Sequence, residues 1–77
     1  MTFKLFRSSA EKELDSIIGE MKINLANNYK EPAHKAREKL GARTEALHAA
    51  GKLTDKQYRA YKALYDEYTQ RLKDYHH

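Results

Sequence analysis

The stretch from Gly51 to Tyr58 constrains this chain most, because it predicts where one helix ends and the next begins. Gly51 follows a run of helix-forming residues, and glycine most readily adopts the left-handed conformation that closes a helix. Thr54 and Gln57 stand at capping-box spacing, in which each side chain accepts a hydrogen bond from a free backbone N–H of a new helix. The connection spans about four residues, and such short connections favour antiparallel helices.

An apolar stripe predicts a first helix over residues 9–27. Ser8 and Glu11 stand at capping-box spacing at its start. The apolar residues recur at intervals of three and four, as on one face of a helix: Leu14, Ile17, Ile18, Met21 and Leu25. Ile23 lies off this stripe, where it either widens the buried face or contacts a partner.

The segment from Asn27 to Pro32 interrupts the helical pattern, because proline in a helix interior removes a hydrogen bond and clashes with the preceding turn. Either Asn28, with Glu31 three residues later, caps a second helix, or Asn27 ends the first. A single kinked helix is the alternative to two separate helices.

A second helix is predicted over residues 31–50, with a thin apolar face of mostly small residues. The members of that face are Ala33, Ala36, Leu40, Leu47 and Ala50. Gly41 lies inside this helix, at a cost of roughly 1 kcal/mol relative to alanine. It either permits a close contact or is simply tolerated.

The predicted third helix, residues 55–74, carries a heptad-spaced stripe that consists almost entirely of tyrosine. Its members are Tyr58, Tyr61, Tyr65, Tyr68, Leu72 and Tyr75. A phenol buries its ring, but its hydroxyl needs water or a hydrogen-bond partner. We therefore expect a half-buried interaction face.

Together these segments predict an all-α fold, a small three-helix bundle in which the second and third helices form an antiparallel hairpin. The chain, residues 1–77, is expected to be a single helical domain, with residues 1–7 as an N-terminal arm. This arm carries three apolar residues, Phe3, Leu5 and Phe6, for which the sequence leaves three alternatives. They either pack over the helices, fray as a terminus or contact a membrane surface. No apolar run approaches the ~20 residues of a membrane span.

The residue types do not point to catalysis, a metal or a cofactor. The chain has no cysteine, so disulfides and thiolate metal sites are excluded. We find no glycine-rich phosphate loop and no nucleophile matched to a base and an acid. His34 and His48 lie about 21 Å apart along a helix, too far to share a metal ion. His76 and His77 are either native or the remnant of a purification tag.

Basic residues exceed acidic ones, 15 to 11, which gives a formal net charge of +4 and favours polyanionic partners. Six basic residues around the predicted second helix and the following turn are candidate nucleic-acid contacts: Lys35, Lys39, Arg43, Lys52, Lys56 and Arg59. The alternative is a solvated face, because Glu31, Glu38 and Glu45 are interleaved with them.

Seven residues around the turn resemble the short C-terminal helical hairpin called SHOCT: Leu47, Gly51, Leu53, Thr54, Gln57, Tyr58 and Lys62. The resemblance covers residues 44–65 and implies an oligomerisation or protein-contact module. The leading prediction is thus a cytoplasmic, non-catalytic interaction or oligomerisation module that binds a second copy of itself, as a homodimer, or another protein. The alternative is a small nucleic-acid-binding accessory or regulatory protein.

Overall fold

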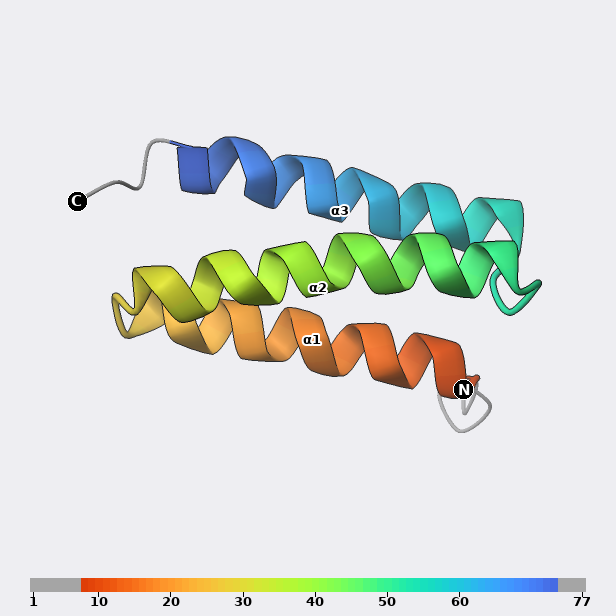
Figure 1. The fold of residues 1–77 in the computed structure, drawn as a ribbon, viewed down its shortest axis with the longest axis horizontal. Helices are drawn as coiled ribbons and strands as arrows, with labels where there is room; N and C mark the ends of the chain where they lie inside the picture. Colours follow the sequence, from red (N-terminus) through yellow and green to blue (C-terminus); the bar gives the residue numbers. More distant parts are fainter. Residues whose placement is uncertain (1–7, 74–77) are drawn as a thin grey trace, which may run out of the picture.

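Three helices make up the computed structural model, which describes residues 8–73: α1 (Ser9–Ala26), α2 (Lys30–Ala49) and α3 (Asp55–Lys73). In Figure 1, α2 lies between α1 and α3 and runs antiparallel to both. The Cα atoms span 39 × 26 × 15 Å, so the helices form a flattened bundle. The predicted all-α fold and the antiparallel hairpin of α2 and α3 are confirmed.

The start of α1 follows from the predicted capping box. The Glu11 backbone N–H donates to Ser8 Oγ at 3.1 Å, and the Ser8 N–H donates to Glu11 Oε1 at 3.2 Å. These two bonds satisfy donors that the first turn of a helix leaves without intrahelical partners. The predicted N-terminal arm, Tyr75 and the terminal histidines lie outside the described residues.

Two separate helices, and not one kinked helix, occupy residues 9–49. Asn27 is the C-cap of α1, and Asn28 adopts a left-handed conformation with φ 63°. This geometry suits asparagine better than most residues other than glycine. Of the two alternatives for this segment, the end of the first helix at Asn27 is confirmed. The cap at Asn28 is wrong, because Tyr29 is the N-cap of α2 and its side chain makes no capping hydrogen bond.

The second turn has the predicted chemistry. Gly51 has φ 76°, and the following N–H of Lys52 donates to the Leu47 carbonyl at 2.9 Å. The N–H of Gln57 donates to Thr54 Oγ1 at 3.0 Å, and the N–H of Thr54 donates to Gln57 Oε1 at 2.9 Å. Both predicted signals for an abrupt reversal between α2 and α3 are confirmed.

The core lies where the three apolar faces meet. It contains Ala10, Leu14, Ile17, Ile18, Met21, Ala36, Leu40, Leu47, Leu53, Tyr61 and Tyr68. The predicted face of α2 is buried except at Ala50, which is its exposed C-cap. Thr44 is fully buried in α2, and its hydroxyl has no hydrogen-bond partner among the described residues. Ile23 is 62% exposed and so does not widen the buried face.

Gly41 marks a close approach between α2 and α3. A Cβ atom placed at Gly41 would lie 2.5 Å from Cε1 of Tyr65, well inside van der Waals contact. The absence of a side chain at this position therefore lets the Tyr65 ring lie directly on the backbone of α2.

Among the described residues, none of the three helices combines the length and the apolar character that a membrane span requires.

Candidate functional site

The tyrosine stripe of α3 faces inward in the single chain. Tyr61, Tyr68 and Leu72 are buried, whereas Tyr58 and Tyr65 are half-buried along the edge next to α2. The Tyr61 hydroxyl donates to Asp15 Oδ1 of α1 at 2.9 Å. Within the described residues the stripe thus packs the bundle, and only its edge is available to a partner of the folded chain.

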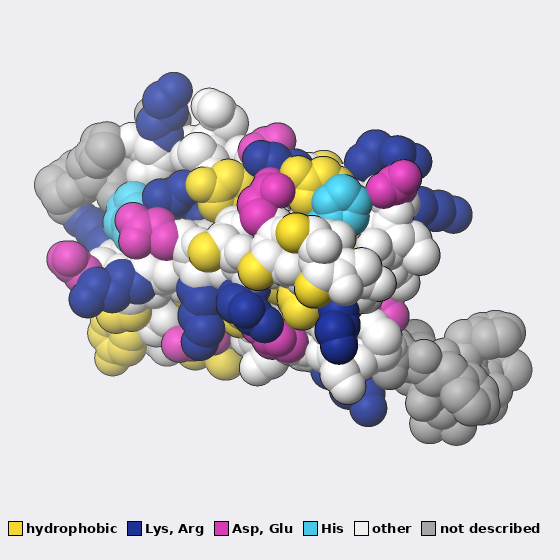
Figure 2. Space-filling model, turned by 45° about the vertical axis from the view of Figure 1, so that its right-hand side comes forward, with side chains coloured by type: hydrophobic (Ala, Val, Ile, Leu, Met, Phe, Trp, Pro, Cys, Tyr) yellow, Lys and Arg dark blue, Asp and Glu magenta, His cyan; other side chains and the backbone are white. Residues whose placement is uncertain are grey.

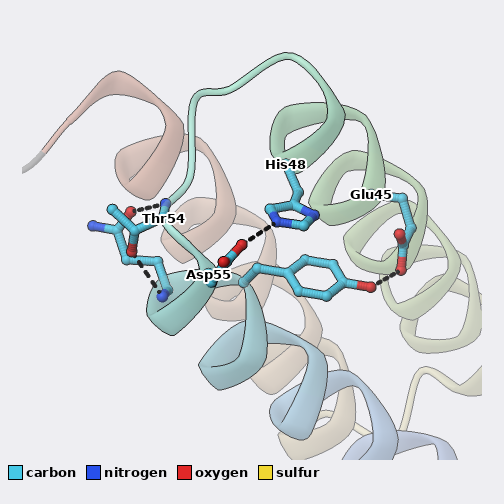
Figure 3. A network of polar contacts seen from close by, with 6 residues as sticks. Glu45, His48, Thr54 and Asp55 are labelled. Atoms are coloured by element: carbon cyan, nitrogen blue, oxygen red, sulfur yellow. Dashed lines mark hydrogen bonds and ion pairs between the residues drawn. The ribbon is translucent and has the colours of Figure 1, made fainter.

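A polar network joins α2 and α3 next to the Gly51 turn (Figure 3). His48 stacks on Tyr58 with ring centroids 4.0 Å apart, and His48 Nε2 lies 3.0 Å from Asp55 Oδ1. The Tyr58 hydroxyl donates to Glu45 Oε2 at 2.8 Å. The hydrogen bond from His48 lowers the pKa of Asp55. The hydrogen bond to Glu45 raises the pKa of Tyr58, because it stabilises the neutral phenol beside a carboxylate.

A second polar cluster lies farther along the same seam and centres on Arg37. Arg37 Nη1 donates to the Tyr65 hydroxyl and to Thr69 Oγ1, both at 3.2 Å. The guanidinium carbon lies 5.5 Å from the centroid of the Tyr65 ring, and Lys62 Nζ lies 5.3 Å from the same centroid. The Tyr65 ring thus contacts two cations, whose charge is attracted to its π face.

Arg37 is not among the site residues predicted from the sequence, although its position in α2 carries a signal. Arg37 follows Ala33 by four residues and precedes Leu40 by three, so helical spacing places it beside the apolar face of α2. Its side chain is only 17% exposed. A basic residue beside an apolar face of a helix indicates a partly buried charge.

The six predicted nucleic-acid contacts do not form one ridge. Arg43 turns toward α1, where Nη2 donates to Glu13 Oε1 at 3.1 Å and Nε binds Glu13 Oε2. Lys35 and Lys39 are exposed on the first half of α2. Figure 2 shows Lys and Arg side chains interspersed with Asp and Glu, without a continuous basic strip on the face in view.

The remaining three predicted contacts, Lys52, Lys56 and Arg59, are exposed at the turn and the start of α3. Lys52 follows Lys39 by thirteen positions, which corresponds to roughly 20 Å along a helix. The structure therefore places these exposed basic residues in two groups, one on the first half of α2 and the other at the turn and the start of α3. Within the described residues, no group of three or more His, Cys, Asp or Glu side chains could hold a metal ion.

We expect the Glu13–Arg43 pair to make the free energy of unfolding depend on pH in the acidic range. The hydrogen bond from Arg43 lowers the pKa of Glu13 from its ordinary value of 4.5. The folded chain releases the Glu13 carboxyl proton more readily than the unfolded chain does. The pair therefore stabilises the fold at pH values above 4.5, the ordinary pKa of the carboxyl group. That contribution is lost as the pH falls through the lower folded pKa. Urea unfolding at a series of pH values measures it.

Arg43→Gln is the matched variant for this prediction, because it removes the partner and leaves Glu13 with a more ordinary pKa. Its stability is expected to fall less steeply with acid than that of the wild type. The difference is small, since the side chains of Arg43 and Glu13 are 42% and 36% exposed. Parallel stability curves for the two proteins would contradict the assignment.

The outward face of α2 carries an uncharged stripe. Ala42, Ala46 and Ala49 are exposed at positions i, i+4 and i+7, and so lie on one side of the helix. The two charged residues between them turn to the flanking helices. Arg43 binds Glu13 of α1, and Glu45 accepts a hydrogen bond from Tyr58 of α3.

Comparison of the chain with known protein families, with curated proteins and with solved structures finds no match in any of the three. The resemblance of residues 44–65 to the SHOCT hairpin therefore stays a prediction. The proposals below are supported by the geometry of the chain itself.

Proposed function

We propose that this chain is a non-catalytic helical module that binds protein, with a second copy of itself as the first partner. The supporting observation is the outward face of α2. This helix lies in the middle of a flattened bundle, and α1 and α3 leave the side with Ala42, Ala46 and Ala49 uncovered. We call these three residues the alanine face.

The alanine face suits the docking of another helix. Small side chains let two helix backbones approach closely, and i, i+4, i+7 spacing places them on one seam. Hydrogen bonds hold Arg43 toward α1 and Glu45 toward α3, so their charges lie to either side of the seam on which a helix would dock. Lys35 and Lys39 continue the stripe toward the start of α2, and their aliphatic stems can cover apolar surface while the ammonium groups stay in water.

Self-association is tested by the mass of the protein in solution. We expect sedimentation equilibrium to show a mass that rises with concentration from 9.0 kDa toward twice that value. Ala46→Arg places a long charged side chain in the centre of the alanine face, and is expected to keep the protein monomeric with unchanged helical circular dichroism.

Ala60→Arg is the matched control, because Ala60 is exposed on α3 and lies off the alanine face. It adds the same side chain and is expected to leave the association unchanged. A wild-type protein that stays at 9.0 kDa at every concentration would contradict self-association. Equal loss of association in both variants would contradict the assignment of the surface.

Nucleic-acid binding is the second candidate function, and a separate observation favours it. Lys35, Lys39, Lys52, Lys56 and Arg59 are exposed, and none forms an ion pair with another described residue. Fluorescence anisotropy with duplex and single-stranded DNA at two salt concentrations tests this candidate. Binding that weakens steeply with salt supports it, and no binding at low salt contradicts it.

A further inference from the structure

Arg37 is a largely buried cation that no carboxylate neutralises by a hydrogen bond. Its guanidinium donates to two neutral oxygens, the Tyr65 hydroxyl and Thr69 Oγ1. Thr69 Oγ1 in turn donates to the Tyr65 carbonyl at 2.8 Å, so it accepts from Arg37 through a lone pair. The ion pair of Arg37 with Glu38 spans 3.9 Å, beyond hydrogen-bond distance, and the Glu38 side chain is 69% exposed.

This arrangement leaves part of the hydrogen-bonding capacity of Arg37 unused. The guanidinium has five N–H donors, and Nε is buried with no partner among the described residues. A buried charge normally has an oppositely charged partner or a full set of hydrogen bonds, because its desolvation is costly. Neutral partners and a distant, solvated carboxylate provide neither.

A cavity adjoins this cation between α2 and α3. Its volume is about 230 Å³, and it is lined by His34, Arg37, Thr69, Leu72 and Lys73. Among the described residues that line it, none is acidic. Lys73 forms no ion pair with another described residue. The cavity thus brings two cations and a histidine together around a single apolar side chain.

We propose that this cavity binds a small oxyanion, a carboxylate or a phosphate group. The guanidinium fork of Arg37 matches the paired oxygens of either group, and the Lys73 ammonium adds a second positive charge. His34 supplies a ring nitrogen, and the Leu72 side chain forms an apolar wall. The volume suits a group of this size with a short apolar extension, and does not suit a polymer. This inference is independent of the alanine face, because the cavity lies on the α2–α3 seam.

Titration with sodium phosphate and with sodium acetate, each against sodium chloride at equal ionic strength, tests the proposal. The measurement is the amide chemical shifts of ¹⁵N-labelled full-length protein. We expect saturable shifts around His34, Thr69 and Lys73 with at least one oxyanion and none with chloride. Saturation with phosphate alone identifies a phosphate site, and saturation with acetate alone a carboxylate site. Equal shifts with chloride would overturn the proposal.

Arg37→Gln is expected to weaken the binding at least tenfold, and Lys73→Gln severalfold. Arg59→Gln is the matched control, because it removes an exposed arginine of α3 that lies outside the cavity. Its affinity is expected to equal that of the wild type. If Arg37→Gln fails to fold, Lys73→Gln decides alone, since Lys73 is exposed. An equal loss in Lys73→Gln and Arg59→Gln would show general charge attraction and overturn the site.

Discussion

Replacing Tyr61 by alanine is expected to lower the free energy of unfolding by about 3–5 kcal/mol, as for other large aromatic residues truncated in a core. Tyr61 is only 7% exposed, and its hydroxyl reaches Asp15 at 2.9 Å. It therefore links α3 to α1, while α2 lies between these helices in Figure 1. Domains of this size are stable by roughly 5 to 15 kcal/mol, so this loss is a large fraction of the total. Urea unfolding followed by circular dichroism measures it.

Two further variants distinguish the contributions to stability. One isolates the hydroxyl of Tyr61 from its ring, and the other compares Tyr61 with a tyrosine at the edge of the stripe. Tyr61→Phe keeps the ring and is expected to cost about 1 kcal/mol, the contribution of one hydrogen bond. Tyr58→Ala removes a half-buried ring at the edge of the same stripe, and is expected to cost less than Tyr61→Ala. Equal losses for Tyr58→Ala and Tyr61→Ala would contradict the inward orientation of the stripe.

The expected loss of stability in Tyr61→Ala also determines how the proposed self-association can be tested. A change of mass in Tyr61→Ala would report loss of folding as readily as loss of an interface. Ala46 is a better position, because it is exposed and no hydrogen bond depends on its side chain. The face predicted from the tyrosine spacing and the face that is free in the folded chain are therefore different surfaces.

The sequence predicts the fold well because its signals are local. A capping box satisfies specific backbone donors, and a glycine at a left-handed position closes a helix, so Ser8, Gly51 and Thr54 each determine a boundary without reference to the rest of the chain. The sequence leaves two alternatives at Asn27 and Asn28 because asparagine both caps helices and adopts positive φ, and only the geometry of the turn selects between these roles.

The candidate sites depend on contacts between helices, which spacing alone does not determine. The heptad spacing of α3 shows that the tyrosines share a face, but not whether another helix of the same chain covers it. The partner of Arg43 is Glu13, thirty residues away, and only the packing of α1 on α2 turns Arg43 away from the other predicted nucleic-acid contacts. The cavity beside Arg37 likewise requires the relative placement of α2 and α3.

The contact between Gly41 and Tyr65 leads to the second large expected effect. In a helix interior, alanine is about 1 kcal/mol more favourable than glycine. Gly41→Ala is nevertheless expected to lower the free energy of unfolding by about 1–3 kcal/mol, the usual cost of overpacking. The new Cβ would lie 2.5 Å from Cε1 of Tyr65, and the ring cannot move away without disturbing the hydrogen bond from Arg37. Thermal and urea unfolding measure the change.

Gly19→Ala is the matched control, because Gly19 lies inside α1 and a Cβ atom added there would meet no neighbouring element within 4 Å. It is expected to raise the free energy of unfolding by about 1 kcal/mol, so the same substitution has opposite signs at the two glycines. Removing the obstructing ring provides the decisive comparison. In a Tyr65→Ala background, Gly41→Ala is expected to become stabilising, because only the helix preference remains. If Gly41→Ala stabilises the wild type as much as it stabilises Tyr65→Ala, α2 and α3 do not pack as closely at this position as the structure shows.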